Sequence, residues 1–577
     1  MPGAAWSLRR GGVERGRDSS AAETGGPAVK LWDRSLDRYP NRVARYWYLA
    51  IVVVSAIVLY YEFYVPAAVT PSIIADYHMT WPFFVYVIVV GNLIGAFASL
   101  IAGLADRWGR ANLVAYGLLV TGLIVLVGIP NAPDLWVYAV LYGLLGFVEG
   151  IILVATPALI RDFSPQLGRA TAMGFWTIGP VVASLTVSLV ASHTLNHLHA
   201  WQDQFTITGI TGLIVWAIAF VGLRELSPGL RDQLMVSIRD RALVEARASG
   251  VDIEESLRHP MRKVLHLDVV GPSFGIGLFL VVYYTLIAFL VVYMATNFGY
   301  TLQRANALGN WVWGFNAGAL VVVGLLSDWA RVRKPFMVLG IAGSAAATSL
   351  LAVNAIHPHT SYYTFVWILS LLSVSLGFTF APWLAAFTET VEAHSPALAA
   401  TGLAIWGWVL RLVVAASLFL LPYVVTTMTP LVEHGTEVAT LSAKYAPEIQ
   451  TLSAIDAQTL GALSANPADA AAAAKAVGEI ATTFKVSPAV ALQRLQAVAT
   501  VPPAALVTLR TYGPKVEHAA AVTPHEWQRW WWVSVGCEIV LLPFLLIMRG
   551  RWSPAKARRD AEEHEKMVQE ALAALHR

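Results

Sequence analysis

Charge is scarce in this chain. Asp, Glu, Lys and Arg together make up 13% of its 577 residues, whereas a soluble domain carries about a quarter. Hydrophobic residues amount to 56%, and the mean hydropathy is +0.58. This composition argues against an ordinary soluble protein and favours one membrane-embedded body.

The chain also has almost no cysteine, a small net charge and no nucleotide-binding motif. Cys537 is the single cysteine, which excludes an intramolecular disulfide and a Cys-based metal cluster. A net charge of +3 offers no basic surface for nucleic acid. No Walker-type phosphate loop occurs, so ATP hydrolysis is not expected. We therefore expect no enzyme activity, no cofactor, no metal and no nucleic-acid partner.

Long apolar runs alternate with short polar breaks. A span needs about 20 apolar residues, and a helix is expected because lipid offers no hydrogen-bond partner to an open backbone. The runs are continuous, unlike the alternating strands of a β-barrel. The sequence thus predicts an all-α membrane protein with twelve spans, at 47–69, 81–104, 112–129, 136–159, 171–192, 204–223, 268–295, 306–326, 335–354, 362–387, 399–425 and 529–548.

Basic residues gather in every second break. Nine Lys and Arg residues precede the first span, and others follow the second, fourth, sixth, eighth and last spans. The opposite short breaks hold almost none, with Arg304 as the exception. By the positive-inside bias, both termini are expected in the cytoplasm, which requires an even number of spans. We expect a multi-pass plasma-membrane protein, of a bacterial inner membrane.

The chain ends are expected to be cytoplasmic tails, at 1–46 and 550–577. The apolar run after the first tail is too long for a secretory signal and lacks a small-residue cleavage site. The pair Arg9-Arg10 is followed by no nearby apolar segment, so a twin-arginine signal is not expected.

Two parts of the chain repeat one plan. The break after the second span reads Ala-Gly-Leu-Ala-Asp106-Arg-Trp-Gly-Arg, and the break after the eighth reads Gly-Leu-Leu-Ser-Asp328-Trp-Ala-Arg. Ser164-Pro opens the fifth span, and Ser395-Pro opens the eleventh. The repeat predicts two six-helix units: an N-terminal half at 47–224, and a C-terminal half made of 268–425 and a last helix at 529–549.

The segment Asp106-Arg107-x-Gly109-Arg110 is similar to the cytoplasmic loop signature of the major facilitator superfamily. The segment that begins at Asp328 resembles its weaker second copy, and the resemblance covers nearly all of 46–550. The family's leading glycine position holds an alanine here. The resemblance implies two six-helix pseudo-repeat bundles, secondary transport by alternating access, and a substrate site between the bundles at mid-membrane.

The same resemblance implies that this loop latches the outward-facing form. Asp106 can pair with arginines and with the positive N-terminus of a neighbouring helix. The alternative is that these arginines only set topology. The expected gate residues are Asp106, Arg107, Gly109, Arg110, Asp328, Arg331 and Arg333.

Two insertions are expected outside the spans. Residues 225–267 join the halves and carry a helical apolar stripe, which predicts a cytoplasmic amphipathic helix that tethers or gates. Residues 426–528 are rich in alanine and other helix formers. They predict an extracytoplasmic cap of short helices that filters substrate, binds a partner or shields the opening.

Ionisable residues inside spans are functional candidates by default. Glu62 lies near the middle of the first span, where an acid in a low dielectric can take and release a proton near neutral pH. Tyr61-Glu62-Phe63 resembles the Tyr-Asp-Phe segment of metabolite–proton symporters in this superfamily. Leu59 stands where those proteins often carry a further acid. Glu62 is thus a predicted proton-coupling residue, against a structural hydrogen-bonded acid.

Arg411 lies near the centre of the eleventh span. Because a guanidinium keeps its charge, it needs an anion nearby. That anion is either a carboxylate substrate or Glu538 in the last span, so the buried pair Arg411–Glu538 is the alternative. The oxalate/formate exchangers of this superfamily similarly place a cation in the eleventh span.

Glu149 in the fourth span and a set of aromatic residues complete the predicted site. Glu149 sits in a Gly-x-x-Glu-Gly pattern that resembles many family members, but Tyr142 replaces their arginine. It is a second proton-coupling candidate, with a structural role as the alternative. Aromatic rings can surround an organic ion or simply pack. The predicted substrate-binding residues are Arg411, Tyr61, Tyr284, Trp313, Trp383 and Trp408.

The sequence therefore favours proton-coupled symport of a small organic acid, with protons, an organic anion and the lipid bilayer as partners. Two alternatives stay open. One is efflux of amphipathic compounds by proton antiport. The other is a receptor that does not transport and senses a ligand through residues 426–528.

Overall fold

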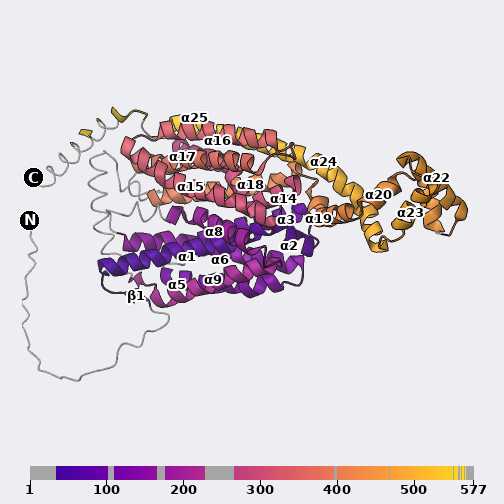
Figure 1. Ribbon diagram of the computed structural model, residues 1–577. Helices are drawn as coiled ribbons and strands as arrows, with labels where there is room; N and C mark the ends of the chain where they lie inside the picture. Colours follow the sequence, from indigo (N-terminus) through magenta and orange to yellow (C-terminus); the bar gives the residue numbers. More distant parts are fainter. Residues whose placement is uncertain are drawn as a thin grey trace, which may run out of the picture.

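The computed structural model describes residues 34–566 apart from 102–108, 165–175, 228–229, 231–264, 395–398, 467, 550–551, 556–558, 560–561 and 564–565. The described chain is an elongated bundle of long helices with a smaller helical projection at one end (Figure 1). The short strand β1 (Ser35–Leu36), near the start of the described chain, lies at the other end. We call these the extension end and the terminal end of the bundle.

The N-terminal half begins with a helix that is capped by a side chain. Asn41 accepts a hydrogen bond from the amide of Ala44, which satisfies one of the free donors of the first turn. A π-helical turn at Ile124–Gly128 and a 3₁₀ turn at Ile129–Asn131 prolong the third span. The helices of this half are α1 (Arg42–Ala68), α2 (Thr70–Asp76), α3 (Trp81–Ile101), α5 (Arg110–Leu123), α6 (Leu135–Phe163), α8 (Gly179–Thr194) and α9 (Trp201–Gly222).

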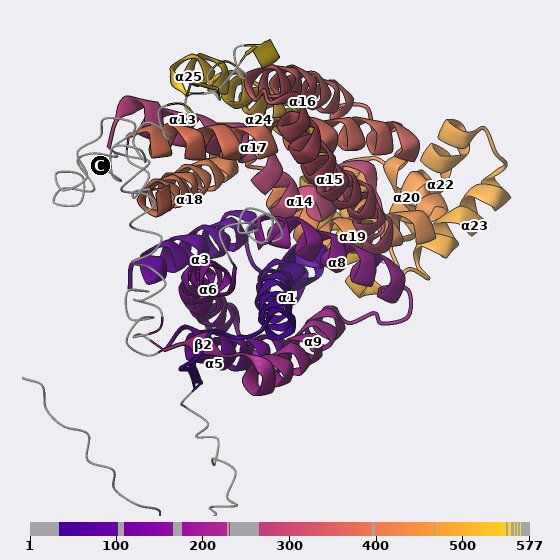
Figure 2. The ribbon, with the colours of Figure 1, turned by 90° about the vertical axis from the view of Figure 1, so that its left-hand side faces the viewer.

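The C-terminal half repeats this plan beside the first half (Figure 2). Its first span is interrupted at Leu280, where α13 gives way to α14. Its helices are α13 (Leu267–Phe279), α14 (Val281–Phe298), α15 (Leu302–Ala330), α16 (Lys334–Asn354), α17 (Tyr362–His394), α18 (Ala399–Val424), α24 (Pro503–Ile539) and α25 (Leu541–Ile547).

The all-α membrane architecture predicted from the sequence is confirmed. Eleven helical segments within the described ranges are long and apolar enough to cross a membrane. Each coincides with a predicted span. The remaining predicted span, the fifth, corresponds to α8, whose preceding residues 165–175 lie outside the described parts. Large apolar side chains such as Trp311 and Leu325 are exposed on the bundle surface, as lipid contact allows.

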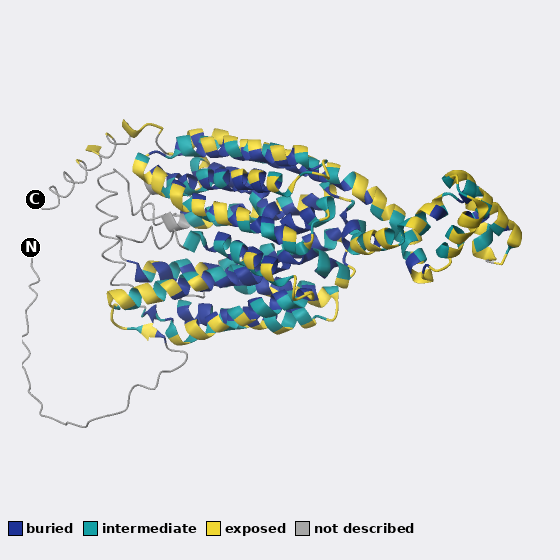
Figure 3. Cartoon of the chain, viewed as in Figure 1, coloured by how far each residue is buried: buried dark blue, intermediate teal, exposed yellow. Residues whose placement is uncertain are grey.

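The projection is built from α19 (Met428–Lys444), α20 (Ala446–Ser453), α21 (Ala457–Ala465), α22 (Ala470–Phe484) and α23 (Pro488–Val498). It has a small apolar core of its own around Ile455, Ile480 and Ala491. Most of its surface is exposed or half-buried (Figure 3). The short helices that the sequence predicted for this segment are therefore present, though not as a body separated from the last span. Helix α24 starts in the projection at Pro503 and runs without a break past residue 528 into the bundle.

One buried acid joins the two ends of the projection. Glu526 on α24 accepts hydrogen bonds from the amide and the hydroxyl of both Thr426 and Thr427, at 2.6–3.0 Å. These residues lie where the chain leaves the bundle, and Glu526 lies where it returns. The four donors hold α19 and α24 together at this point.

Glycines allow a close helix contact in the N-terminal half. Gly91 and Gly95 on α3 face Gly146 and Gly150 on α6, and each pair is one helical turn apart. A Cβ atom on Gly150 would collide with the backbone of Gly95, and one on Gly146 with that of Gly91. Small residues at this spacing let helices approach closely in a membrane.

The segment before the first span is not only a tail. Ser35–Leu36 (β1) pairs in parallel with Glu225–Leu226 (β2), at the start of the linker between the halves. Arg34 donates to the backbone carbonyls of Ala219 and Phe220, and its partial burial lowers the pKa of its guanidinium. Nearly all of the linker itself, with the amphipathic helix expected there, lies outside the described residues.

Candidate functional site

An ion pair crosses the boundary between the two halves. Arg411 on α18 points its Nη1 atom to Oε2 of Glu149 on α6, at 3.7 Å. The Glu149 side chain is 6% exposed and that of Arg411 is 23% exposed. Gly95 makes room for both groups, because a Cβ there would lie 3.1 Å from the guanidinium and 3.2 Å from the carboxylate.

The predicted pairing of Arg411 with Glu538 does not occur in this structure. Glu538 lies instead against α16, where the Thr348 hydroxyl donates to its Oε1 at 2.9 Å. Arg411 thus faces Glu149 of the N-terminal half rather than Glu538 of the last span. The sequence offered only Glu538 or a substrate carboxylate as partners and did not pair Arg411 with Glu149, because the choice depends on which side of α18 faces the other half.

Tyrosines surround the ion pair. Tyr60 and Tyr64 of α1 and Tyr284 of α14 lie close enough to Arg411 to interact with its charge. The rings of Tyr60 and Tyr64 are 5.5 Å apart. Tyr283 packs edge-on against Tyr284 at 5.2 Å and against Trp313 at 5.6 Å. Two of the predicted residues, Tyr284 and Trp313, thus belong to this group.

The other predicted aromatic residues lie elsewhere. Tyr61 is turned toward Thr208 of α9, inside the N-terminal half. Trp383 packs on Trp406 at 5.7 Å and on Phe387 at 4.9 Å. Trp408 packs edge-on against the exposed ring of Phe97.

Helical phase explains why Tyr60 and Tyr64, rather than the predicted Tyr61, lie beside the ion pair. Tyr60 and Tyr64 are four positions apart and therefore share one face of α1. Tyr61 and Glu62 belong to another face. The spacing of the tyrosines was a usable signal, although it did not tell which face of α1 lines the boundary.

Glu62 is fully buried within the N-terminal half. Its carboxyl fills the space above Gly212 of α9, where a Cβ atom would collide with Oε1. Thr121 of α5 faces the carboxyl, but neither oxygen has a well-formed hydrogen bond among the described residues. Glu62 and Arg411 are therefore two separate sites in this conformation.

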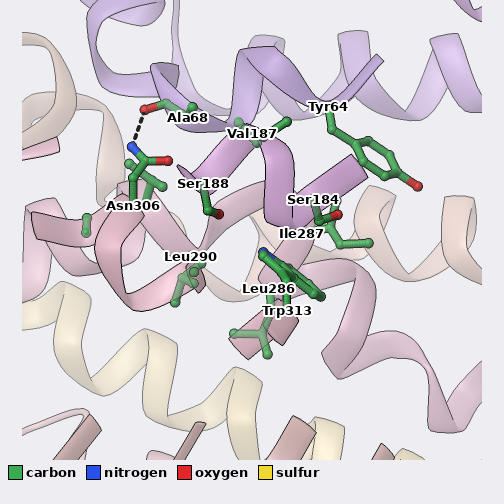
Figure 4. A pocket seen from close by; sticks show the side chains of 14 residues that line it. Tyr64, Ala68, Ser184, Val187, Ser188, Leu286, Ile287, Leu290, Asn306 and Trp313 are labelled. Atoms are coloured by element: carbon green, nitrogen blue, oxygen red, sulfur yellow. Dashed lines mark hydrogen bonds between the residues drawn. The ribbon is translucent and has the colours of Figure 1, made fainter. Parts of the chain in front are cut away.

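A narrow pocket lies where α1 and α8 meet α14 and α15 (Figure 4). Its wall combines the hydroxyls of Ser184 and Ser188 with apolar side chains of α14 and with Trp313. The cavity volume is about 20 Å³, which is room for about one water molecule. In this conformation the pocket is therefore too small for an organic substrate.

Direct contacts close the extension end of the boundary. Asn306 of α15 donates to the carbonyl of Ala68 at 3.0 Å, and Asn310 donates to Ser192 of α8 at 3.0 Å. Helix α19 of the projection adds a further contact, since the amide of Trp81 donates to the Thr429 hydroxyl at 3.0 Å. The halves are thus joined near this end.

His78 and Glu433 form another contact between α19 and the N-terminal half. Their Nδ1 and Oε1 atoms are 3.3 Å apart, and His434 approaches the same carboxylate oxygen at 3.6 Å. The projection therefore reaches across from the C-terminal half, in which both of its ends are rooted, to the N-terminal half.

The described residues of the predicted gate motifs lie at the terminal end. Asp106 and Arg107 lie outside the described residues. Gly109 has a φ of +87°, a conformation that favours glycine. The Arg110 side chain donates to both oxygens of Asp162 at 2.9 Å, and its amide donates to Glu225 at 2.8 Å.

The second copy of the motif has a network of its own. Arg333 pairs with Asp328 at 2.6 Å and with Glu389 at 3.4 Å, while Arg331 ends α15 in the left-handed region. All of these contacts lie within the C-terminal half. The described residues thus show an acid–base cluster around Asp328 and, in the first copy, the contacts of Arg110 with Asp162 and Glu225. The role of both motifs as gates stays a prediction.

Comparison with known proteins agrees with this architecture. The chain is 24% identical over 298 residues to a probable chloroplastic anion transporter of Oryza sativa subsp. japonica, which covers 48% of this chain and 55% of that protein. It is 24% identical over 290 residues to a putative metabolite transport protein of Bacillus subtilis (strain 168), covering 46% and 60%. The chain therefore matches little more than half the length of these relatives.

The fold is also found among solved structures. A bacterial homologue of the human lysosomal transporter Spinster, in an inward-facing and occupied conformation, superimposes with a TM-score of 0.57 at 14% sequence identity, covering 89% of this chain and all of that one. The family model of the Major Facilitator Superfamily matches residues 51–418. This chain belongs to the Major Facilitator Superfamily.

Proposed function

We propose that this protein is a secondary transporter that moves a small organic anion together with protons. The observation that carries the proposal is the Arg411–Glu149 pair, which joins the two halves inside the bundle. A permanent cation on one half meets a titratable acid on the other. The similarity to an anion transporter and to a metabolite transport protein supports the same class of substrate.

Competition for Arg411 supplies the coupling. When Glu149 is ionised, it neutralises the guanidinium, and a substrate carboxylate has no free cation to bind. When Glu149 takes a proton, Arg411 loses its internal partner and its charge becomes available to the substrate. One proton therefore accompanies one carboxylate, and the net charge of the site stays constant while the halves move.

The neighbouring tyrosines fit the same task. Tyr60, Tyr64 and Tyr284 bring hydroxyl groups to the Arg411 charge, and a hydroxyl can donate to a carboxylate. The aromatic rings offer an apolar wall to the carbon skeleton of the substrate. Glu62 is a second protonatable acid of the same half, and we propose that it also contributes to proton coupling.

Alternating access follows from the two-half construction. The contacts of Asn306, Asn310 and α19 hold the extension end shut here, so the opposite movement must break them. We propose that the terminal end faces the cytoplasm of a bacterial cell and that the projection lies outside the inner membrane. The distribution of Lys and Arg supports this orientation.

Uptake into liposomes tests the proposal. The purified protein is given a panel of radiolabelled mono- and dicarboxylates with and without an inward proton gradient. We expect the gradient to stimulate uptake by the wild type. Arg411→Gln should reduce uptake about ten- to hundredfold, which corresponds to a charge-assisted hydrogen bond of about 1.5–3 kcal/mol. Glu149→Gln should abolish the stimulation and keep exchange of substrate for substrate.

Arg304→Gln is the matched control. Arg304 is also a cation of the C-terminal half, but it stacks on Tyr300 and Tyr362 at the extension end. Its loss should leave gradient-driven uptake within about twofold of wild type, because surface charges contribute little. Full gradient-driven uptake of the acids by Arg411→Gln would exclude Arg411 as the anion site and with it the proposed coupling.

Proton-coupled efflux of amphipathic compounds is the second candidate. The apolar lining of the narrow pocket, with Leu286, Ile287, Leu290 and Trp313, favours it. The two functions differ in their dependence on Arg411. Extrusion of a neutral amphipathic dye by Arg411→Gln at the wild-type rate, in the absence of acid uptake by the wild type, would favour efflux.

A further inference from the structure

A second acid without a charged partner lies in the C-terminal half. Glu538 of α24 is fully buried and faces Ser344 and Thr348 of α16. Thr348 donates to Oε1 at 2.9 Å. Oε2 of Glu538 and the hydroxyl oxygen of Ser344 are both buried without a well-formed hydrogen bond among the described residues.

No charge among the described residues compensates this carboxyl. Helices α13, α14, α16, α18, α19 and α25 pack on α24, and no charged side chain of their described residues interacts with Glu538. Cys537, the preceding residue in the chain, is a titratable neighbour of this carboxyl. An ionised carboxylate inside a span needs a cation, water or several donors. A single hydroxyl donor does not meet that need.

A proton on Glu538 would give both atoms, Oε2 of Glu538 and the Ser344 hydroxyl oxygen, a hydrogen-bond partner. A carboxylic acid that carries its proton on Oε2 has one donor to give. The Ser344 oxygen is the acceptor that faces it, while Oε1 continues to accept from Thr348. The neutral acid would then be held by two hydroxyl groups one helical turn apart on the same face of α16.

The position of Glu538 mirrors that of Glu62. Glu62 lies between the third and sixth spans of its half, α5 and α9, with Thr121 of α5 facing it. Glu538 lies between the third and sixth spans of the other half, α16 and α24, with Thr348 of α16 facing it. Glu62 belongs to α1 and Glu538 to α24. Both carboxyls nevertheless lie at the interface between the third and the sixth span of their half.

We propose that Glu538, with Ser344 and Thr348 as its hydrogen-bond partners, is a proton-binding site of the C-terminal half that is occupied at neutral pH. It is the counterpart of Glu62, so each half buries one protonated acid between its third and sixth spans. Both lie apart from the Arg411–Glu149 pair. The site is defined by its own contacts and does not depend on which substrate the protein carries.

Infrared spectroscopy of the full-length protein in lipid bilayers at neutral pH tests the site. The C=O stretch of a protonated carboxylic acid is separate from the bands of a carboxylate. We expect the wild-type minus Glu538→Gln difference spectrum to contain a carboxylic-acid band. Glutamine has the same shape and brings a donor for Ser344, so the variant should fold. The same difference for Glu149→Gln, whose acid is paired with Arg411, should contain carboxylate bands alone.

The Ser344→Ala variant gives a second infrared test in which Glu538 itself is retained. Losing the acceptor should move the Glu538 carboxylic-acid band to higher frequency, because the acid then donates no hydrogen bond. A Glu538 difference spectrum with carboxylate bands alone overturns the proposal. A band that is unmoved by Ser344→Ala overturns the assigned partner. Neither result bears on anion transport, so the site and the proposed function can fail separately.

Discussion

Single residues in the spans differ in what their neighbours allow them to do. Arg411 and Glu149 neutralise each other across the boundary of the halves. Glu62 and Glu538 have no such partner among the described residues and lie inside one half each. Burying a charge in the bilayer is costly unless it is compensated. The first pair is therefore suited to exchange one partner for a substrate, whereas the two lone acids are suited to hold protons.

Glu62→Gln gives a prediction at this scale. The amide fills the same space beside Gly212 but cannot carry a proton. We expect substrate exchange to persist. Gradient-driven uptake in liposomes should fall about tenfold or more, because residue 62 can no longer take up and release a proton. Undiminished gradient-driven uptake would remove Glu62 from the mechanism and leave Glu149 as the coupling acid.

At the scale of the helices, the contact between α3 and α6 bears directly on the position of Glu149. The glycines that face each other at this contact let the two backbones approach, and Glu149 lies beside Gly150 on α6. Helix α3 also packs on α18, which carries Arg411. The distance between the two charges therefore depends on how closely these helices pack.

Gly150→Ala should push α3 and α6 apart. The new Cβ meets the Gly95 backbone, which cannot move aside as a flexible side chain can. We expect a loss of about 1–3 kcal/mol, as for other overpacked cores, visible as a lower melting temperature in detergent. Gly314→Ala is the control, because a Cβ at Gly314 meets no atom within 4 Å. Equal melting temperatures for the two variants would contradict the assigned contact.

The polar contact between α8 and α15 predicts a cross-link that stops movement. In a Cys537→Ser background, which removes the natural thiol, Ser192→Cys with Asn310→Cys places two thiols where a hydrogen bond of 3.0 Å now joins the halves. A short thiol cross-linker should abolish uptake reversibly. The control pair Thr194→Cys with Gln204→Cys lies within one half and should not. Uptake that survives the first cross-link would show that these helices need not separate.

On the scale of the whole molecule, the projection is the feature that most needs a role. Its outer helices α20 to α23 have a separate small core, whereas α19 touches the N-terminal half through Thr429 and Glu433. Its root is fixed by Glu526. The inner part is thus placed to act on the movement of the halves, and the outer part is not.

Replacing residues 446–502 with a short Gly-Ser linker tests whether the protein works as a transporter or as a receptor that senses a ligand through the projection. The change keeps α19, α24 and the Glu526 contacts. We expect gradient-driven uptake to stay within about twofold of wild type, because the apolar core of the bundle is untouched. A variant that folds, as judged by its melting temperature, yet transports nothing would assign an essential role to the outer helices.

The sequence by itself determined the class and the plan of the molecule. Twenty apolar residues in a row must become a helix in lipid, because no other local structure satisfies the backbone there. The positions of the basic residues predict the orientation of the spans. The repeated loops predict the two halves. The family resemblance was visible for the same reason, since the signature around Asp106 is contiguous.

The tertiary structure alone decided which charges meet. Sequence reasoning offered Arg411 a substrate carboxylate or Glu538, whereas its pairing with Glu149 depends on the rotation of α18 and on the close approach at Gly95. Tyr60 and Tyr61 are adjacent in the chain, yet they belong to different sites because a helix turns by about 100° per residue. Hydropathy is a property of each segment, whereas the face that a segment presents is settled by packing against segments far away in the chain.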